Sequence, residues 1–392
     1  MNTRSDTAPP PIQKYPWARQ VIAIAVILFL LLGGLEMGAR TLTRQSANPT
    51  LYRITQDYGR LASRGPDWIR FVPDEELAYR LRPEFELNAS QGGGKTIHNS
   101  EGFREEAPFP PKDGDTLRIC CYGGSTTYGV GVESNNDTYP AQLEQTLWGA
   151  ARGQGWERIE VFNLGVGGYT SREILGTMKR TIPLLKPDVV LIQNAINDVI
   201  PRFYPEFQAD YSHFRTPFTP LTVSHWHKLL YRSHAWLTMA HGLGWIRPLS
   251  LQSQTQRPMP PVDEALVNLD ANPTTAFEDN LRAEVALARE SGAQVWLLTQ
   301  PYLDVPDFAG PDADSRKLEG GYRKGLAQHT EVVVRLSKEM NTGLVPLHES
   351  MPRERAFYSD PIHMSAAGNQ RKAALIADSM GPTLPKHPAP AN

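Results

Sequence analysis

A serine stands at the point where a run of apolar residues ends. Residues 117–131 read LRICCYGGSTTYGVG, and Ser125 follows the second of two adjacent glycines. A serine hydroxyl is a poor nucleophile until a base within hydrogen-bond reach takes its proton, and a carboxylate commonly orients that base. The segment YSDPIHMSAAG supplies a carboxylate and a base in Asp360 and His363. These three residue types together suit nucleophilic catalysis.

Two further segments carry groups that could bind a developing negative charge. NLGVGGYTS contains the flexible pair Gly167 and Gly168, and NAINDV contains the amide side chain of Asn197. Each motif alone has a simpler explanation, because glycine and serine make turns, asparagine caps helices and glycine accepts a positive φ angle. The occurrence of all four segments in one chain favours an active site.

The surrounding pattern predicts how these residues meet. Short apolar runs alternate with longer amphipathic segments, which is typical of an α/β fold with a parallel sheet of about five strands. The expected strands cover residues 117–123, 160–165, 188–195, 293–301 and 342–347, and the expected helices cover residues 139–150, 171–185, 275–291 and 331–340. Ligands bind outside the carboxyl ends of such strands, so we expect the four segments at one edge of the sheet.

These segments resemble the four sequence blocks of the SGNH hydrolases, the family also called GDSL esterases and lipases. GGSTTYG, NLGVGGYTS, NAIND and DPIHMSAAGNQ occur in the order of that family, over most of Leu117 to Met380. The resemblance implies a three-layer α/β/α, flavodoxin-like SGNH hydrolase fold and a serine-dependent carboxylic ester hydrolase. Gly124 stands where the GDSL motif has an aspartate, as in GGS-type members, and that aspartate is not the acid of the triad. The upstream segments PDEELAYRLRP and NSEGFR resemble the extension of membrane-anchored bacterial members.

The resemblance also assigns roles to single residues. Ser125 corresponds to the nucleophile, His363 to the general base, and Asp360 to the carboxylate that orients the imidazole. The backbone N–H groups of Ser125 and Gly168 and the side-chain amide of Asn197 correspond to the oxyanion hole.

The cysteines and the remaining motifs give no sign of a cofactor. Cys120 and Cys121 are adjacent, too close for ordinary disulfide geometry, and lie inside an apolar run, so we expect them to be core residues. The chain has no Cys-x-x-Cys zinc spacing, no Walker-type loop and no nucleotide-binding fingerprint. We therefore expect neither a metal nor a cofactor.

Two groups of histidines are weaker candidates. His225, His227 and His234 could form a metal cluster, but they lack carboxylates and alternate with aromatic and leucine residues, which favours packing. His348 and Glu349 follow the fifth expected strand and could border the pocket, although a solvated loop is the simpler interpretation.

The N-terminal sequence predicts attachment to a membrane. Residues 21–35, VIAIAVILFLLLGGL, contain no polar side chain, and Trp17 and Arg19 precede them. The run is short for a span, so a cleaved signal peptide is the alternative, but cleavage after Gly38 or Ala39 would not fit the small-x-small pattern. We expect an uncleaved signal anchor with its N-terminus inside and an extracytoplasmic catalytic domain, periplasmic if the cell is Gram-negative.

Composition bounds the remaining possibilities. The chain has 392 residues, of which 40% are hydrophobic, and this is enough for a large core. With 40 Lys and Arg against 42 Asp and Glu, it has no broad basic surface, so nucleic acid is not an expected partner. The oligomeric state stays open.

The expected organisation has five parts. They are a cytoplasmic tail (1–20), the anchor (21–39), a stalk and N-terminal extension (40–115), the hydrolase domain (116–380) and a disordered tail (381–392). Aromatic residues such as Tyr79, Phe85 and Phe103 could pack the extension onto the domain.

Residues 199–273 are an insertion within the hydrolase domain. They far exceed the ~15 residues at which structureless loops become uncommon in compact domains. The insertion leaves the sheet edge that carries Asn197 and is rich in aromatic residues, among them Phe203, Tyr204, Phe207, Tyr211, Phe214, Trp226, Tyr231, Trp236 and Trp245. We expect a cap beside the active site that binds a sugar ring or an acyl chain. The alternative is that the rings only attach the insertion to the body.

The sequence thus predicts an extracytoplasmic serine esterase for O-acetyl or short acyl esters, with an acylated carbohydrate as the expected substrate. Two alternatives stay open. A polysaccharide O-acyltransferase would use the same triad, because the sequence does not distinguish water from a sugar hydroxyl as acceptor. A non-enzymatic polysaccharide assembly factor is disfavoured, since every catalytic position is filled.

Overall fold

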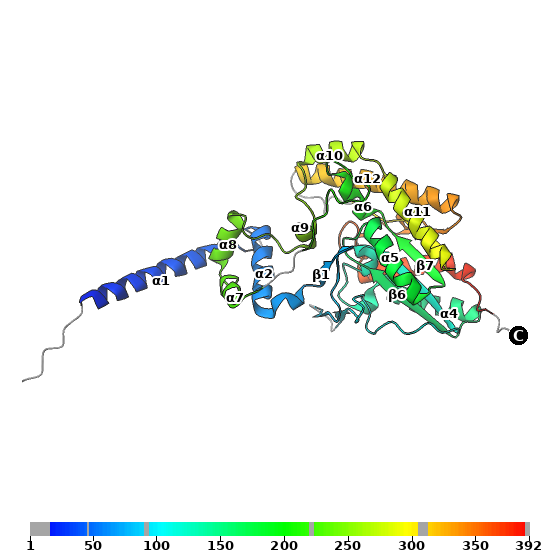
Figure 1. Cartoon of the computed structure of the whole chain (residues 1–392), viewed down its shortest axis with the longest axis horizontal. Coiled ribbons are helices and arrows are strands. Elements are labelled where there is room, and N and C mark those ends of the chain that lie inside the picture. The colour runs from blue at the N-terminus through cyan, green and yellow to red at the C-terminus, as the bar shows by residue number, and fades with distance from the viewer. Residues whose placement is uncertain (1–15, 45–46, 90–93, 219–222, 305–312, 389–392) are drawn as a thin grey trace, which may run out of the picture. The chain divides into compact units, whose positions relative to one another are not determined.

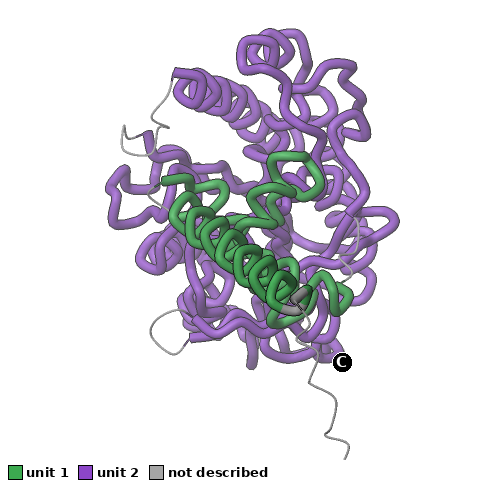
Figure 2. The backbone as a smooth tube through the Cα atoms, turned by 90° about the vertical axis from the view of Figure 1, so that its left-hand side faces the viewer, with its two compact units in different colours: residues 1–66, 222–249 green, residues 67–221, 250–392 purple. Residues whose placement is uncertain are grey.

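The computed structural model describes residues 16–44, 47–89, 94–218, 223–304 and 313–388. The chain forms two compact units, which Figure 2 distinguishes by colour: unit 1 comprises residues 1–66 and 222–249, and unit 2 comprises residues 67–221 and 250–392. Unit 1 therefore combines the N-terminal region with a segment from the middle of the expected insertion. Most of the expected cytoplasmic tail, residues 1–15, lies outside the described residues.

A five-stranded parallel sheet forms the centre of unit 2 (Figure 1). Its strands lie in the order β6-β5-β7-β8-β9, and each neighbouring pair is parallel. The strands are β5 Thr116–Gly123, β6 Arg158–Gly165, β7 Val189–Gln193, β8 Gln294–Leu298 and β9 Gly343–Val345. The predicted α/β class and the predicted number of parallel strands are confirmed.

Helices cover both faces of this sheet and so make three layers. On one face, α4 (Tyr139–Gly153) packs against α14 (Ala366–Met380). On the other face lie α5 (Ser171–Leu185), α11 (Thr275–Glu290) and α12 (Ala313–Glu339). Shorter helices of unit 2 are α3 Ser125–Tyr128, α6 Ile196–Arg202, α9 Leu251–Thr255, α10 Val262–Ala271 and α13 Leu347–Ser350.

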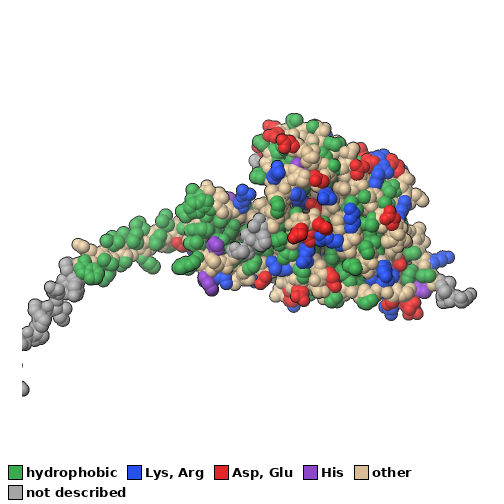
Figure 3. Space-filling view, viewed as in Figure 1, with side chains coloured by type: hydrophobic (Ala, Val, Ile, Leu, Met, Phe, Trp, Pro, Cys, Tyr) green, Lys and Arg blue, Asp and Glu red, His purple; other side chains and the backbone are tan. Residues whose placement is uncertain are grey.

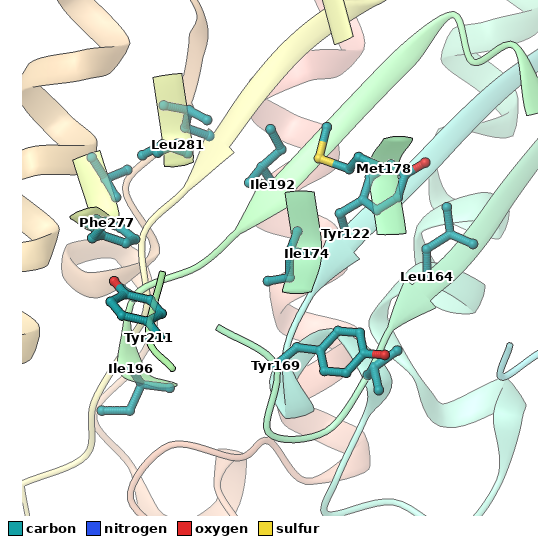
Figure 4. Packing of buried hydrophobic residues seen from close by; sticks show 14 of the residues in the cluster. Tyr122, Leu164, Tyr169, Ile174, Met178, Ile192, Ile196, Tyr211, Phe277 and Leu281 are labelled. Carbon is teal, nitrogen blue, oxygen red and sulfur yellow. The ribbon is translucent and has the colours of Figure 1, made fainter. Parts of the chain in front are cut away.

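Successive side chains of β5 enter different cores, as the period of two of a strand requires. Cys120 and Tyr122 belong to the core beneath α5, α11 and α12, whereas Ile119 and Cys121 belong to the core beneath α4 and α14. Figure 4 shows the first core, where residues of neighbouring strands and of α5 converge: Tyr122, Leu164, Ile192, Ile174 and Met178. Both cysteines are fully buried, in agreement with a packing role.

The part of the N-terminal extension from residue 67 onward folds onto the sheet instead of forming a stalk. β1 (Phe71–Asp74) pairs with β2 (Ala78–Leu81), and β3 (Glu86–Asn88) pairs with β4 (Lys95–Ile97), both antiparallel. Two of the three aromatic residues singled out in the extension make contact with the main core. Tyr79 lies in the main core, Phe103 packs against that core, and Phe85 is buried with its ring centroid 4.9 Å from that of His98.

Two carboxylates protect the open edge of the sheet. β6 is an edge strand, so its outward N–H groups need acceptors. Asn163 donates its N–H to Oε1 of Glu105 at 2.6 Å, and Val161 donates to Oε2 of Glu144 at 2.9 Å. Glu105 comes from the N-terminal extension and Glu144 from α4, so both elements are fixed to the same strand.

Unit 1 contains the apolar N-terminal helix. Its helices are α1 Pro16–Leu42, α2 Pro49–Arg64, α7 His225–Leu230 and α8 His234–Gly242. The stretch Arg19–Leu42 is long and apolar enough to cross a membrane, with a mean hydropathy of 2.5, and hydrophobic side chains cover the helix in Figure 3. A signal sequence near the N-terminus has the same properties. The sequence did not indicate α2, because its region was assigned to a polar stalk.

A carboxylate of α1 binds the first turn of α8. Glu36 accepts hydrogen bonds from Ser233 Oγ at 2.9 Å and from the N–H groups of His234 and Ala235 at 3.2 and 3.1 Å. The N–H groups at a helix start have no acceptor within the helix, and a negative charge there is favourable. Near the end of α1, Thr43 Oγ1 lies 2.6 Å from Nδ1 of His234. The second half of α1 is therefore part of the folded unit 1.

His227 packs locally, whereas His225 is exposed. The ring of His227 stacks on Tyr231, with centroids 5.4 Å apart and an interplanar angle of 12°, and its Nδ1 lies 3.1 Å from Ser224 Oγ. Among the described residues, no group of three metal-ligating side chains is found.

The C-terminal segment corrects one expectation. Residues 381–388, assigned to a disordered tail, pack on unit 2. Leu384 is buried in the core with α4 and α14, and the indole Nε1 of Trp156 donates to the carbonyl of Pro385 at 2.8 Å. Gln294 Nε2 also donates to the carbonyl of Thr383 at 3.2 Å, and the N–H of His387 donates to the carbonyl of Gln154 at 2.9 Å. Several contacts thus hold a segment whose composition is typical of loops.

Glu105 makes the stability of this fold pH-dependent. Burial raises the pKa of Glu105 to about 8, although the hydrogen bond from Asn163 acts in the opposite direction. The folded state then keeps a proton that the unfolded chain loses near pH 4.5, so stability falls as the pH rises from about 4.5 to about 8. Glu105→Gln keeps an acceptor for Asn163 and removes the titration. Between about pH 5 and about pH 8 we expect the wild type to lose about 1 to 3 kcal/mol more stability than this variant, measured by urea unfolding in detergent.

The exposed neighbour provides the control for this measurement. Glu106→Gln makes the same substitution at the next position and should change the pH dependence of the wild type much less than Glu105→Gln does. Equal slopes for wild type and Glu105→Gln would show that Glu105 is ionised in the folded state.

Candidate active site

Ser125 lies where β5 delivers the chain to the carboxyl edge of the sheet. The strand ends at Gly123 and is buried along its whole length, and Ser125 opens the short helix α3. The carbonyl of Gly124 accepts the N–H groups of Thr127 and Tyr128 at 3.2 and 3.0 Å. Because Ser125 is the first residue of this helix, its own N–H has no acceptor within it.

His363 and Asp360 form a continuous hydrogen-bonded chain with Ser125. Nε2 of His363 lies 2.7 Å from Ser125 Oγ, and Nδ1 of His363 lies 2.6 Å from Oδ2 of Asp360. The other carboxylate oxygen of Asp360 accepts the N–H groups of Ile362 and His363, each at 2.9 Å. The backbone of the loop therefore fixes the carboxylate, and the carboxylate fixes the imidazole.

The charge of Asp360 determines which imidazole nitrogen carries the proton. Burial by itself would raise the pKa of Asp360, but the hydrogen bond and charge of His363 and the two backbone N–H groups outweigh burial and lower the pKa below its ordinary value. An ionised carboxylate accepts only, so Nδ1 of His363 must donate to it. In the neutral imidazole Nε2 is then unprotonated and accepts the hydrogen of the Ser125 hydroxyl.

Buried polar side chains beneath the site join the serine turn to the histidine loop. Gln300 Oε1 lies 3.2 Å from Thr126 Oγ1, and Gln300 Nε2 donates to the carbonyl of Ile362 at 3.2 Å. Lys372 Nζ donates to Gln193 Oε1 at 2.5 Å and lies 3.4 Å from the carbonyl of Thr126. Burial lowers the pKa of Lys372, which is fully buried. The turn that carries Ser125 and the loop that carries His363 are thus linked twice: directly by the contact between Ser125 and His363, and indirectly by Gln300 beneath them.

The Gly167–Gly168 turn is held by hydrogen bonds to both of its carbonyl groups. Tyr79 Oη donates to the carbonyl of Gly167 at 3.0 Å, and Arg215 Nη2 donates to the carbonyl of Gly168 at 2.8 Å. In a trans peptide the N–H points opposite to the carbonyl of the preceding residue. The N–H of Gly168 therefore points away from Tyr79. The φ of Gly168 is +79°, and a Cβ there would lie 2.8 Å from Tyr79 Oη. Glycine is the residue that fits this turn.

Arg215 is itself anchored by a buried carboxylate. Its Nε donates to Oε1 of Glu173 at 2.8 Å, and Oε2 of Glu173 accepts the N–H and the hydroxyl of Thr170 at 2.7 and 2.6 Å. Glu173 caps the start of α5, so the turn before this helix, the helix and Arg215 form one unit. Reasoning from the sequence missed Tyr79 and Arg215 as site residues, because neither lies in one of the four motifs.

Asn197 lies at the start of α6, directly after β7. Its Nδ2 donates to the carbonyl of Tyr169 at 2.8 Å, which leaves the second amide hydrogen for a group in the cavity. The chain turns into α6 through Ala195, whose φ of +127° is strained for a residue with a side chain. His329 Nδ1 lies 3.0 Å from the carbonyl of Ala195 and supports this conformation.

Steric hindrance explains why residue 124 is a glycine in this site. A Cβ at residue 124 would lie 2.7 Å from Nδ2 of Asn197, well inside van der Waals contact. A side chain there would push the amide of Asn197 away from Tyr169. The departure from the GDSL motif at residue 124 therefore fits the position of Asn197.

A cavity of about 660 Å³ opens onto these groups. All five predicted site residues line it, namely Ser125, Gly168, Asn197, Asp360 and His363. Other groups around it are Arg70 and Phe71 of the extension, Leu251 and Gln252 of α9, and Tyr302, Glu319 and Tyr322. His348 borders a different cavity, where its Nδ1 lies 2.8 Å from Thr299 Oγ1.

The insertion contributes to the cavity differently from the expected aromatic cap. None of the nine aromatic residues named for it, all of them within the described part of the chain, lines the cavity. Phe203, Tyr204, Tyr211 and Phe214 are buried in the core of unit 2, and Trp226, Tyr231, Trp236 and Trp245 belong to unit 1. The alternative holds for the first group, whose rings attach the insertion to the body. Ile200 and the α9 residues supply the lining instead.

The arrangement is suited to attack on a carbonyl carbon. Ser125 has a base within hydrogen-bond distance, and the base has an orienting carboxylate. The N–H of Ser125, the N–H of Gly168 and the amide of Asn197 provide donors for the oxygen that becomes negative during such an attack. Nothing in this chemistry needs a group from outside the chain.

The comparisons with known proteins agree with this chemistry. The sequence model of the GDSL-like lipase/acylhydrolase family matches residues 121–371. Curated proteins gave no match. The chain is similar to the solved structure of a lipase/acylhydrolase from Enterococcus faecalis at 18% identity, with 69% of this chain and 99% of that chain covered and a TM-score of 0.41. It is also similar to a catalytic mutant of an acetylxylan esterase from Geobacillus stearothermophilus, at 18% identity, 69% and 96% coverage and a TM-score of 0.40.

Restoring the aspartate of the GDSL motif should impair this site. In Gly124→Asp the new side chain displaces the amide of Asn197, which removes a donor from the position of the developing charge. We expect Ser125 to react about ten-fold or more slowly with a fluorophosphonate probe, whose phosphoryl oxygen needs the same donors. The rate of labelling, followed by intact-protein mass spectrometry, measures the effect.

The control variant substitutes a glycine whose surroundings leave room for a side chain. Gly114→Asp introduces the same side chain where no atom lies within 4 Å of the Cβ position, and it should label at the wild-type rate. Wild-type labelling of Gly124→Asp would mean that the site tolerates a side chain at residue 124 without losing the donor.

Proposed function

The chain belongs to the GDSL-like lipase/acylhydrolase family, whose members are carboxylic ester hydrolases, and we propose that it hydrolyses acyl esters through an acyl-serine at Ser125. The observation that carries the proposal is the hydrogen-bonded chain from Asp360 through His363 to Ser125 at the wall of the cavity. Each link of that chain has the length of a hydrogen bond, so the serine is already paired with its base.

In the first half of the reaction Ser125 becomes acylated. Nε2 of His363 takes the hydroxyl proton while Oγ bonds to the carbonyl carbon of the ester, and Asp360 stabilises the imidazolium that results. The tetrahedral intermediate then collapses. The bond to the alcohol oxygen breaks, and His363 returns the proton to that oxygen, so the alcohol leaves neutral and the acyl group stays on Ser125.

Three donors support the oxygen that carries the negative charge. They are the N–H of Ser125, the N–H of Gly168 and the free amide hydrogen of Asn197. Tyr79 and Arg215 act as positioning residues, because they hold the carbonyls of Gly167 and Gly168 and so direct the N–H between them. These donors are fixed before the substrate arrives, which avoids reorganisation during the reaction.

In the second half water removes the acyl group. The oxygen of a water molecule attacks the acyl carbon while His363 takes a proton from that water. The same three donors bind the negative charge that forms on the carbonyl oxygen. Collapse breaks the bond to Oγ, the proton passes to Ser125, and a carboxylic acid leaves. The enzyme is restored without any other co-reactant.

The proposed substrates are O-acetyl or other short acyl esters of a carbohydrate. Three aromatic side chains line the cavity, Phe71, Tyr302 and Tyr322. Aromatic faces suit the apolar faces of a sugar ring, and the hydroxyl groups of the two tyrosines can bind polar substituents. The carbohydrate assignment rests on these rings and not on the aromatic residues of the insertion.

Substitution of the catalytic chain tests the proposal. Ser125→Ala and His363→Ala should each reduce the hydrolysis of 4-nitrophenyl acetate about 10⁴-fold or more, because the two residues act as one unit. The melting temperature should change little, since both side chains line a cavity and not the core. His348→Ala is the matched control, because this histidine lies in another cavity and should leave turnover unchanged.

Product analysis separates hydrolysis from acyl transfer. With an acetylated glycan, mass spectrometry should detect free acetate and deacetylated glycan, and wild-type protein given an acetyl donor and bare glycan should leave the glycan unmodified. Acetylation of the glycan would identify a sugar hydroxyl as the acceptor. Full activity of Ser125→Ala would refute the proposed mechanism.

We further propose that α1 is retained as a signal anchor and holds the catalytic domain outside the cytoplasm. The apolar length of Arg19–Leu42 supports an anchor. The contact of Glu36 with the start of α8 supports retention, because cleavage after Gly38 or Ala39 would separate this carboxylate from the N–H groups that it binds.

The anchor is tested on the protein as it occurs in cells. After alkaline carbonate washing we expect the mature protein in the membrane fraction, with residues of α1 still present in its peptide map. A soluble protein that begins near Arg40 would demonstrate a cleaved signal peptide.

A further inference from the structure

One cationic side chain reaches the active-site cavity from the N-terminal extension. Arg70 immediately precedes β1, is half-buried, and lines the same cavity as Ser125 and His363. The family motifs do not include this residue, and the proposed reaction at Ser125 does not use it. A guanidinium beside a largely apolar cavity requires an explanation, because an unpaired charge there loses hydration without compensation.

Arg70 has no acidic partner within the described part of the chain. The ion pairs found there involve other arginines and lysines, such as Arg118, Arg180, Arg215 and Arg323. The contact found for the Arg70 guanidinium is the ring of Tyr128, with Cζ 5.7 Å from the ring centroid. A cation over an aromatic face keeps its N–H donors available.

The groups closest to Arg70 include a second positive charge, and no carboxylate forms an ion pair with either guanidinium in the described part of the chain. A second guanidinium, that of Arg104, lies over the same ring at 4.9 Å and donates to the carbonyls of Tyr128 and Gly129. His98 lies 2.9 Å from the hydroxyl of Tyr128. Burial lowers the pKa of His98 to about 4, so this imidazole is neutral at physiological pH. The described neighbours therefore give Arg70 no paired negative charge.

The two carboxylates that line the cavity have other partners. Asp360 binds His363 and two backbone N–H groups. Glu319 on α12 lies 3.2 Å from the hydroxyl of Tyr302, and neither carboxylate is within ion-pair distance of Arg70. An anion that balances Arg70 would therefore have to come from a molecule in the cavity.

We propose that Arg70 binds a carboxylate of the substrate, so that the preferred ester carries an anionic group close to the scissile bond. The planar guanidinium donates two parallel hydrogen bonds to a carboxylate, which positions it better than a single charge would. The substrate class is then an acylated acidic carbohydrate, such as an O-acetylated uronic acid. This inference rests on the proposed ester hydrolysis at Ser125.

Matched esters test the inference. 4-Nitrophenyl acetate is neutral, 4-acetoxybenzoate carries a carboxylate on the alcohol side, and mono-4-nitrophenyl succinate carries one on the acyl side. With the full-length protein in detergent, Arg70→Gln should raise KM at least ten-fold for one of the two anionic esters. The neutral ester should keep its KM and kcat. Arg70→Lys should retain part of the effect, because it keeps the charge and loses the paired donors.

The control removes a charge from the same hairpin. Arg80 on β2 is exposed and does not line the cavity, so Arg80→Gln should leave all three esters unchanged. An equal loss on the neutral and anionic esters would assign Arg70 a structural role and overturn the inference, as would unchanged KM values for both anionic esters. In either case hydrolysis of the neutral ester by the wild type would leave the proposed function intact. No hydrolysis of any ester by the wild type would refute the proposed function itself.

Discussion

The 2.7 Å contact between Ser125 and His363 joins two residues that are 238 positions apart in the chain. A hydrogen bond between such distant residues requires both loops to be placed within a fraction of an ångström. The parallel sheet supplies the coarse placement, because Ser125 follows the interior strand β5. The buried link from Thr126 through Gln300 to the carbonyl of Ile362 supplies the finer one. The hydrogen bond between Ser125 and His363 therefore depends on polar side chains that lie beneath the cavity and do not line it.

The N-terminal extension is part of this machinery. Tyr79 reaches across to the carbonyl of Gly167, and Arg70 brings a charge to the wall of the cavity. Glu105 binds the N–H of Asn163 on the edge strand of the sheet. The segment that precedes the first strand of the hydrolase sheet therefore provides a hydrogen-bond acceptor for the edge strand. It also orients the turn that carries Gly168. A sheet with its helices alone would lack the hydroxyl that holds this turn.

Patterns that are local in sequence were sufficient to predict much of this protein. The strands were recognisable as apolar runs, and the four motifs identified Ser125, His363 and the residues that meet them. What could not be predicted depends on contacts between distant segments. Nothing near Arg215 indicates that its guanidinium holds the carbonyl of Gly168. An aromatic residue such as Phe214 looks the same in the sequence whether its ring binds a ligand or packs in a core. Only the three-dimensional packing distinguishes the two cases.

Unit 1 is built from two separate stretches of chain, and the second of them, residues 222–249, interrupts the sequence of unit 2. This affects how a crystallisable fragment can be designed. A truncation that removes residues 1–66 would leave α7 and α8 behind without α1 and α2, and the first turn of α8 would lose the carboxylate of Glu36. Exposed apolar side chains such as Trp226 and Trp245 would remain on residues 222–249, which would have lost the rest of unit 1, and they would favour aggregation. A well-behaved soluble fragment therefore needs two deletions, one at the N-terminus and one internal, and must still begin early enough to keep Arg70 and Tyr79.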